Sequence, residues 1–246
     1  MTAPSHPSSR HRPRGLTLLH EDKDLLVVNK EAGVLTTGTR RDEPFTAENV
    51  MNAYVRKGCA RSSKQVFLVH RLDRETSGVL LFAKSEEAQQ RIKEGWKNTE
   101  KFYLAAVHGH LKEKTGVFSS YLAEDEDLFV RSVPDAGKGK WSQTAYAVIK
   151  ETPGMSLVKV RLLTGRKNQI RVHFAEHGHP LVGDPKYGMR RDPFRERLCL
   201  HAKSISLDHP HSGKRLFFDT PIPEAIAKLA GGLSESDWAE TRVPTS

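Results

Sequence analysis

The chain has 246 residues and a formal net charge of +9, with 39 lysines and arginines against 30 aspartates and glutamates. Its only cysteines, Cys59 and Cys199, exclude a scaffold held by several disulfides, and we expect both to be reduced, buried thiols. The apolar stretches are far shorter than the ~20 residues of a membrane-spanning helix. These properties predict a cytoplasmic protein whose positive charge favours a polyanionic partner, in the first place a nucleic acid.

The two ends of the chain differ from its centre. Residues 1–14 contain Ser, Pro, His and Arg but no acidic residue, and they predict a disordered basic tail. Such a tail could be a loose RNA-contacting arm or only a solubilising leader, and the sequence favours neither. One domain is expected over residues 15–230, followed by a C-terminal tail at 231–246.

The first half of the domain combines strands with two helices. Strands are predicted at 16–20 and 24–29, and a turn at 30–33. Residues 46–56 predict a helix with Thr46 as its N-cap. Val50, Ala53 and Tyr54 are expected to share one face of this helix. Short apolar strands at 66–69 and 79–82 flank a polar loop, and an amphipathic helix at 86–96 follows, with Ala88, Ile92 and Trp96 on one face.

The second half is predicted to be mostly strands. They are expected at 102–107, 116–122, 144–149, 156–163, 198–207 and 215–218, with helices at 168–176 and 223–229. Acidic residues 124–127 and the Gly/Lys-rich stretch 135–140 predict one long, solvated hairpin tip. Because strands occur in adjacent pairs without βαβ alternation, we predict an α+β fold with a mixed, largely antiparallel sheet flanked by a few helices.

The loop at residues 70–78 holds the densest group of reactive side chains. Asp73 lies between Arg71 and Arg74, and their positive charge should keep its carboxylate ionised well below neutral pH. An ionised, partly dehydrated carboxylate can act as a nucleophile or a base. Surface ion pairs of little consequence would use the same residue types, so the spacing alone leaves both interpretations open.

Residues 70–84, HRLDRETSGVLLFAK, closely resemble the signature of the RluA-type pseudouridine synthases. Other segments resemble that family in the same order: DLLVVNKEAG at 24–33, KFYLAAVHG at 101–109, LTGRKNQIRVH at 163–173, PLVGDPKYG at 180–188 and LCLHAKSISLDHP at 198–210. The resemblance covers residues 16–223, and an ordered set of segments is more specific than one HRLD motif. It implies the pseudouridine synthase fold and the isomerisation of uridine in structured RNA, without cofactor or metal.

The resemblance also implies roles for three residues. Asp73 corresponds to the nucleophile, Tyr103 lies against the target uracil, and Arg171 pairs with Asp73. The reaction breaks the N1–C1′ bond, turns the uracil and rejoins it through C5, so it needs a carboxylate and a flat holder for the detached ring. A guanidinium can hold a carboxylate by two contacts. Without the family pattern, Tyr103 would be read as a core aromatic and Arg171 as a surface cation.

The RNA-binding residues are expected to be cationic. Arg71 matches the family position that fills the gap left by the extruded uridine, because its planar guanidinium can stack on bases. Arg74, Arg166 and Lys167 are predicted to contact phosphates. Lys30 could do the same or be a solvated turn residue, and both interpretations remain open.

Two positions depart from the family pattern. Asn168 stands where the commonest third motif has His, which is expected to mark a subgroup with its own RNA target. Glu31 follows Lys30 where the family often has Pro, which should affect only the rigidity of the turn.

Other chemistries are disfavoured by their spacing. His173, His177 and His179, or His108 with His110, could approach one another, but they lack nearby cysteines and an H-E-x-x-H pattern, so no metal is expected. A glycosidase-like carboxylate pair, Asp73 with Glu75, has no fixed productive separation on a loop.

The sequence therefore predicts a stand-alone, monomeric RNA pseudouridine synthase. On family frequency, ribosomal RNA is the first choice of substrate and transfer RNA the second. The family pattern begins near Leu16, so a preceding S4-type RNA-binding domain is not expected. The competing hypothesis is a catalytically silent RNA-binding or ribosome-assembly factor on the same fold. The combination of Asp73, Tyr103 and Arg171 argues against it, since binding alone needs none of the three.

Overall fold

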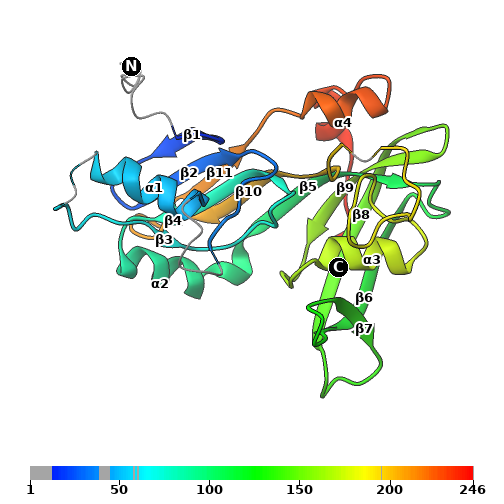
Figure 1. Ribbon diagram of the computed structural model, residues 1–246, viewed down its shortest axis with the longest axis horizontal. Helices are drawn as coiled ribbons and strands as arrows, with labels where there is room; N and C mark the ends of the chain where they lie inside the picture. The colour runs from blue at the N-terminus through cyan, green and yellow to red at the C-terminus, as the bar shows by residue number, and fades with distance from the viewer. Residues whose placement is uncertain (1–12, 39–44, 58, 60, 195, 246) are drawn as a thin grey trace. The chain divides into compact units, whose positions relative to one another are not determined.

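The computed structural model describes residues 13–38, 45–57, 59, 61–194 and 196–245 (Figure 1). The expected basic tail lies outside the described residues except for Pro13 and Arg14. The chain divides into two compact units. Unit 1 comprises Met1–Thr99 with Leu207–Phe218, and unit 2 comprises Glu100–Ser206 with Asp219–Ser246. The stretch expected to form one domain, 15–230, is thus shared between them.

Unit 1 is built on strands with the order β1-β2-β4. All seven residues of β4 are buried, and so are the four apolar residues that begin β2, as their uninterrupted apolar runs predict. A two-residue strand, β3, pairs with β4, so the predicted strand at 66–69 is shorter than expected. The strands of this part are β1 (Leu16–Glu21), β2 (Leu25–Lys30), β3 (Phe67–Leu68) and β4 (Ser77–Ala83). Unit 1 also holds β11 (Arg215–Asp219) as far as Phe218 and the last two residues of β10 (Leu200–Asp208).

The first helix, α1 (Ala47–Arg56), begins as predicted but buries a different face. The Thr46 side chain accepts a hydrogen bond from the Asn49 backbone N–H and caps the helix. The buried residues are Ala47, Met51 and Val55. Val50, Ala53 and Tyr54 do share one face of the helix, but this face is not the buried one. Both stripes have helical spacing, and packing against the rest of the unit selects between them.

The second helix, α2 (Glu86–Glu94), is capped by Ser85 and buries Ala88 and Ile92 as predicted. It ends two residues before Trp96, which belongs to a short 3-10 helix, η2 (Trp96–Asn98). Trp96 was therefore wrongly assigned to the α-helical stripe.

Unit 2 contains a sheet with the order β10-β5-β9-β8-β6-β7. Each of these neighbouring pairs is antiparallel, which confirms the predicted α+β class. Strand β7 was not predicted, and the supposed solvated tip is partly ordered because Val130 packs against Leu122 and Val172. The strands that lie wholly in this unit are β5 (Glu100–His108), β6 (Thr115–Glu124), β7 (Val130–Val133), β8 (Lys140–Thr152) and β9 (Met155–Leu162).

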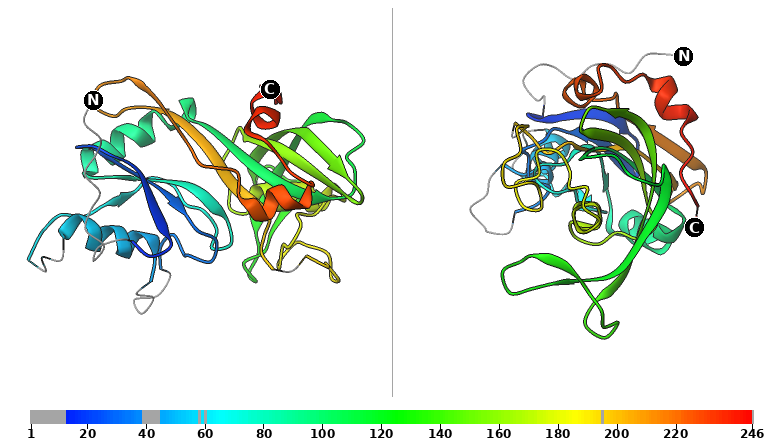
Figure 2. Two further views of the ribbon diagram at one scale, coloured as in Figure 1. Left: turned by 90° about the horizontal axis from the view of Figure 1, so that it is seen from above. Right: turned by 90° about the vertical axis from the view of Figure 1, so that its right-hand side faces the viewer.

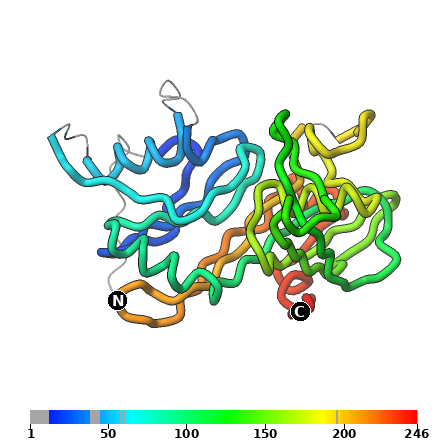
Figure 3. Tube along the Cα trace, turned by 90° about the horizontal axis from the view of Figure 1, so that it is seen from below, coloured from blue at the N-terminus to red at the C-terminus, as the bar shows by residue number. Residues whose placement is uncertain are grey.

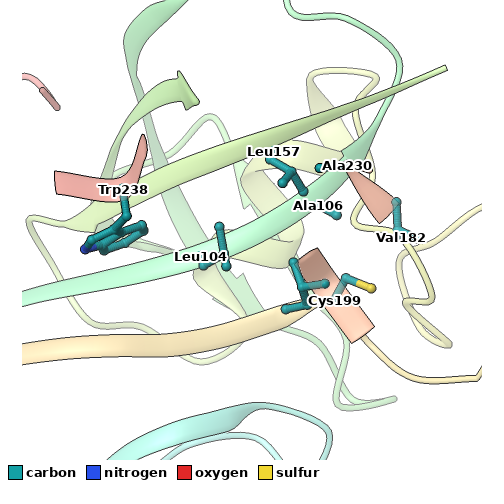
Figure 4. Close-up of a cluster of buried hydrophobic side chains, with 8 residues drawn as sticks. Leu104, Ala106, Leu157, Val182, Cys199, Ala230 and Trp238 are labelled. Atoms are coloured by element: carbon teal, nitrogen blue, oxygen red, sulfur yellow. The ribbon is translucent and has the colours of Figure 1, made fainter. Parts of the chain in front are cut away.

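Opposite faces of the unit 2 sheet carry different helices. Helix α3 (Gln169–Glu176) contacts β6, β7 and β8, and its His173 ring is bonded to Thr144 on β8. The other face carries α4 (Glu224–Leu229) and α5 (Glu235–Glu240), as the red segments of Figure 2 show. The C-terminal helices pack with Leu104 and Leu157, and Figure 4 shows Trp238 and the thiol of Cys199 in the same cluster.

The sequence predicted only a tail at residues 231–246, but this segment contains a helix. The segment includes α5, whose Trp238 is buried under the ammonium of Lys159, 4.5 Å from its ring. The same ammonium donates a hydrogen bond to the Trp238 carbonyl at 2.7 Å. These contacts fix the helix on unit 2. Among the described residues, no helix has the length and apolar character needed to cross a membrane.

Candidate active site

Asp73 lies in unit 1, on the loop that leads from β3 into β4. Asp73 itself is half-buried, its neighbours Arg71 and Arg74 are exposed, and Leu72 and Thr76 are buried. The Thr76 backbone N–H donates to the Asp73 carbonyl at 3.1 Å, which closes a turn. The alternation of buried and exposed residues places the carboxylate and two cations on a loop anchored by buried neighbours.

The residue on each side of Asp73 is held by the segment that follows β2. The Thr36 hydroxyl donates to the Leu72 carbonyl at 2.7 Å and accepts from the Leu72 N–H at 3.1 Å. The Gly33 N–H donates to the Arg74 carbonyl at 2.8 Å, and Arg74 Nε donates to the Gly33 carbonyl at 3.2 Å. The backbone around Asp73 is therefore clamped at both of its flanks.

Lys30 completes this clamp instead of facing solvent. It is fully buried, and its ammonium donates to the backbone carbonyls of Glu31, Val34 and Arg74 at 3.1, 2.8 and 3.2 Å. The interpretations of Lys30 as a phosphate contact and as a solvated turn residue are both wrong, because no part of its side chain reaches the surface. Its charge joins the turn after β2 to the loop of Asp73.

His70 fixes the start of the loop. Its Nε2 accepts a hydrogen bond from the Leu81 backbone N–H at 3.1 Å, so the neutral ring carries its proton on Nδ1. The ring also lies 5.6 Å from that of Trp96, in a tilted arrangement. His70 is thus a structural part of the HRLD motif.

Tyr103 lies in unit 2, on β5. It stands opposite Ala202 of β10 and Val160 of β9, and Val160 stands opposite Tyr146. This register places Tyr103 on the face of Tyr146, which is also the face that carries α3. Tyr103 is almost completely buried. Lys101, two residues earlier and therefore on the same face, is also buried, and burial lowers the pKa of its ammonium.

Arg171 lies on α3 and is held by a carboxylate that the sequence did not single out. Its Nε and Nη2 donate to the two carboxylate oxygens of Asp184 at 2.8 and 2.7 Å. Its Nη1 donates to Asn168 Oδ1 at 3.2 Å, and its guanidinium lies 5.3 Å from the centre of the Tyr187 ring. Arg171 is buried, so the alternative interpretation of it as a surface cation is wrong.

The loop before α3 is organised by the buried side chain of Gln169. Its Oε1 accepts from the Thr164 hydroxyl and the Arg166 N–H, at 2.8 and 3.0 Å. Arg166 and Lys167 are exposed, as RNA contacts would need to be. Arg166 donates to the Trp141 carbonyl at 3.3 Å, and Lys167 pairs with Glu124.

Asn168 has a left-handed backbone, with φ of 54°. Asn, Asp and His are the non-glycine residues that adopt this conformation most readily, so the backbone accepts both the family's His and the Asn of this chain. Instead of capping α3, the Asn168 side chain accepts from Arg171 and donates to the Tyr187 hydroxyl at 3.2 Å.

The histidines that could have suggested a metal site are engaged in hydrogen bonds. His173 contacts Thr144 and Ser120, and His177 Nδ1 contacts the His173 carbonyl. His179 Nδ1 contacts the His108 carbonyl at 3.0 Å. In addition, His108 is paired with Asp192, and His110 bonds to the Thr152 carbonyl.

One further group with metal-ligand chemistry, Asp22, Asp24 and His209, was not singled out from the sequence. His209 Nδ1 accepts from the backbone N–H groups of His211 and Ser212, both at 3.1 Å. The proton of the neutral ring is therefore on Nε2, which faces Asp22 at 3.2 Å. A cation would need the lone pair of that nitrogen, so these contacts suit a hydrogen-bonded link between the β1–β2 turn and the loop after β10.

The predicted catalytic residues are distributed over the two units. Tyr103 and Arg171 share one face of the unit 2 sheet, and Asp73 belongs to unit 1. The pairing of Arg171 with Asp73 stays a prediction. Sequence reasoning missed Thr36, Gln169, Asp184 and Tyr187, although the last two lie in the quoted segment PLVGDPKYG. The cysteines differ from each other: Cys59 is exposed, against expectation, and burial raises the pKa of the Cys199 thiol to about 11.

The chain is similar to proteins that are named RNA pseudouridine synthases. The family model described as RNA pseudouridylate synthase matches residues 24–176. A Bacillus subtilis (strain 168) protein named Uncharacterized RNA pseudouridine synthase YlyB is 32% identical over 231 residues, covering 91% of this chain and 75% of its own. Ribosomal large subunit pseudouridine synthase C of Vibrio vulnificus (strain CMCP6) is 34% identical over 244 residues, covering 96% of this chain and 75% of its own.

Two solved human structures are also similar. RNA Pseudouridylate Synthase Domain Containing 1 superposes with a TM-score of 0.69 and 27% identity, covering 89% of this chain and 87% of that one. RNA Pseudouridylate Synthase Domain Containing 4 has a TM-score of 0.71 and 23% identity, covering 85% and 90%. The second likeness supports the fold.

Proposed function

The chain belongs to the family of RNA pseudouridylate synthases, and we propose that it isomerises specific uridines of ribosomal RNA, with transfer RNA the second choice, through nucleophilic attack by Asp73. Family membership makes the protein an isomerase that modifies RNA. Similar proteins named ribosomal large subunit pseudouridine synthases support ribosomal RNA as the substrate. We expect it to act as a monomer in the cytoplasm, with no cofactor or metal.

The clamp around Asp73 is the observation that carries the assignment. Thr36 holds the backbone of Leu72, and Gly33 with Lys30 holds the backbone of Arg74. The position from which Asp73 presents its carboxylate is therefore fixed. A surface ion pair would not need a backbone fixed at both flanks by buried donors. Fixing a nucleophile before the substrate arrives removes much of the entropic cost of the reaction.

The reaction follows from the chemistry of the carboxylate. An oxygen of Asp73 attacks C1′ of the ribose, and the bond from C1′ to uracil N1 breaks with its electron pair leaving on the uracil. The detached ring turns, C5 bonds to C1′, and Asp73 departs as a carboxylate. The C5 hydrogen is lost as a proton and N1 gains a proton, so the sequence is balanced as an isomerisation.

Tyr103 and Arg171 are assigned to the uracil and the nucleophile. The Tyr103 ring would lie against the detached uracil, since a flat apolar face can hold the ring while it turns. Arg171 would pair with Asp73 and orient its carboxylate. Their position on one face of the unit 2 sheet supports a common role.

The exposed cations are assigned to the RNA backbone. Arg71 would occupy the gap left by the extruded uridine, whose extrusion costs a few kcal/mol. Arg74, Arg166 and Lys167 would contact phosphates. The exposure of all four side chains supports these roles.

Release of tritium from RNA labelled at uracil C5 tests the proposal against a catalytically silent RNA-binding factor. An active synthase expels this hydrogen, and a binding protein does not. Fragments of large-subunit ribosomal RNA and transfer RNA transcripts serve as the two substrates. Mapping pseudouridines in cells with and without the gene then identifies the uridine. No release from any cellular RNA, with binding intact, would favour the silent factor.

A further inference from the structure

The carboxylate of Asp184 is the main partner of the Arg171 guanidinium within unit 2. We propose that Asp184 is a positioning residue for the isomerisation: it fixes the orientation of Arg171 and balances the charge with which Arg171 acts on the nucleophile. This inference rests on the proposed function of Arg171 and Asp73.

Asp184 is held in place independently of Arg171. Its Oδ1 also accepts from the backbone N–H groups of Lys186 and Tyr187, at 2.8 and 3.0 Å. A Cβ added at Gly188 would lie 2.1 Å from the Asp184 carbonyl oxygen, so the turn closes tightly around this residue. The carboxylate therefore forms a fixed platform onto which the guanidinium docks by two parallel contacts.

The geometry of the pair selects one edge of the guanidinium. Asp184 uses the edge formed by Nε and Nη2. A second carboxylate would use the edge formed by Nη1 and Nη2, which Asp184 does not occupy. Asn168 contacts Nη1, and the Tyr187 ring covers one face of the group. Rotation of Arg171 is thus opposed from three sides.

Burial strengthens the electrostatic interaction between Arg171 and Asp184. The side chain of Arg171 is 5% exposed and that of Asp184 is 0% exposed. Solvent screens such a pair poorly, so removal of the Asp184 charge would take away the negative charge that faces the Nε–Nη2 edge of Arg171 inside unit 2. Two other charged groups of this loop have partners of their own, although the Lys186 ammonium also lies 5.6 Å from the centre of the Tyr187 ring. Lys186 donates to the Leu128 carbonyl and lies over the Phe129 ring, while Asp192 pairs with His108.

Two isosteric substitutions change the charge beside Arg171 in opposite directions. Asp184→Asn removes a negative charge from it, and Asn168→Asp adds one at the Nη1 contact. Aspartate tolerates the left-handed backbone at position 168, and the Tyr187 hydroxyl can donate to the new carboxylate. Asn168→Asp is therefore expected to fold even if Asp184→Asn does not.

The test is the pH dependence of the single-turnover rate of tritium release, with circular dichroism recorded at each pH. Asp184→Asn should strengthen the field of Arg171 on the nucleophile and move the acid limb to lower pH, by about one unit. Asn168→Asp should move the limb to higher pH by a similar amount. RNA affinity should stay within about twofold for Asp184→Asn, because Asp184 is buried and is not assigned to RNA. The rates of both variants are measured at saturating RNA, so a change of affinity does not move the limb.

Asp192→Asn is the matched control, since Asp192 is a buried, paired carboxylate of the same loop. A purely structural role for Asp184 predicts a similar loss of rate at every pH, with the acid limb in its wild-type position for all three variants. That result, or an unmoved limb in a folded Asn168→Asp protein, would overturn the inference. Wild-type turnover and an inactive Asp73→Asn variant are established first, so failure of the proposed function is recognised separately.

Discussion

The side chain of Thr36 satisfies both backbone hydrogen-bonding groups of Leu72, the residue before Asp73. Its hydroxyl donates to the carbonyl at 2.7 Å and accepts from the N–H at 3.1 Å, although the two residues are 36 positions apart. Thr36 and Leu72 are both buried, so water cannot replace these bonds. A single hydroxyl thus determines the path of the chain as it reaches the candidate nucleophile.

Thr36→Val should lower both the stability and the activity of the protein. It keeps the shape of the side chain but leaves two buried backbone groups without their partner, at a cost of about 1–3 kcal/mol each before relaxation. We expect a loss of more than tenfold in the single-turnover rate, with RNA affinity within about twofold. Thr37→Val is the control, because Thr37 donates to Glu48 on the partly solvated surface. Equal rates for the two variants would show that the Thr36 contact does not position Asp73.

Lys30→Met separates a buried positioning residue from an RNA contact. The substitution leaves three carbonyls without a common donor, so denaturant unfolding should show a loss of about 1–3 kcal/mol and turnover should fall. The slope of log K against log salt for RNA binding should not change. A slope flattened by roughly one unit would return Lys30 to the phosphate contacts.

Two buried histidines should make the protein sensitive to acid. Burial lowers the pKa of His173 to about 4 and that of His201 to about 3. Between these values and the unfolded pKa of about 6.5, the unfolded chain binds more protons, so stability falls as the pH falls through this window. Each histidine contributes a slope of up to about 1.4 kcal/mol per pH unit. Urea unfolding at pH 7.5, 6 and 5 should show the decline, and His173→Gln should reduce it; an unchanged slope in that variant would contradict the assignment.

Arg71 and Arg166 should fail in different ways. Arg166→Ala should flatten the slope of log K against log salt for RNA binding by roughly one unit, and it should weaken the binding of all RNAs similarly. Arg71→Ala should reduce turnover most on a folded target, where extrusion leaves a gap, and least on a short unpaired strand. The rates are compared at saturating RNA. If Arg71→Ala loses the same factor on both substrates, Arg71 is one more phosphate contact.

The sequence predicts local features of this molecule better than it predicts contacts between residues that are far apart in the chain. The charged loop of Asp73 follows from two apolar runs with polar residues between them, and the stripe of Ala88 and Ile92 from helical spacing. The buried face of α1 could not be chosen, because Met51 with Val55 and Val50 with Tyr54 both fit a helix. The burial of Lys30 depends on three carbonyls that meet only after folding.

Figure 3 shows the course of the chain through β6 and β7, in green, and through the segment after α3, in yellow.

The candidate site shows the same division. Asp73, Tyr103 and Arg171 were found through motif resemblance, which reports residue identity and order. The motif does not report that Asp184 takes two of the donors of Arg171, since that contact depends on a tight turn 13 residues further along the chain. Strand β7 was missed because its burial comes from Val172 on α3, which lies far from it in sequence.

The nucleophilic role of Asp73 is tested most directly by tritium release with the Asp73→Asn variant, on an RNA that the wild-type protein modifies. The account predicts no detectable release from the variant, a normal unfolding transition, and an RNA affinity within about tenfold of wild type, or roughly 1.4 kcal/mol. Release at a rate comparable to that of the wild-type protein would contradict the account, because the carboxylate would then not be needed for the reaction.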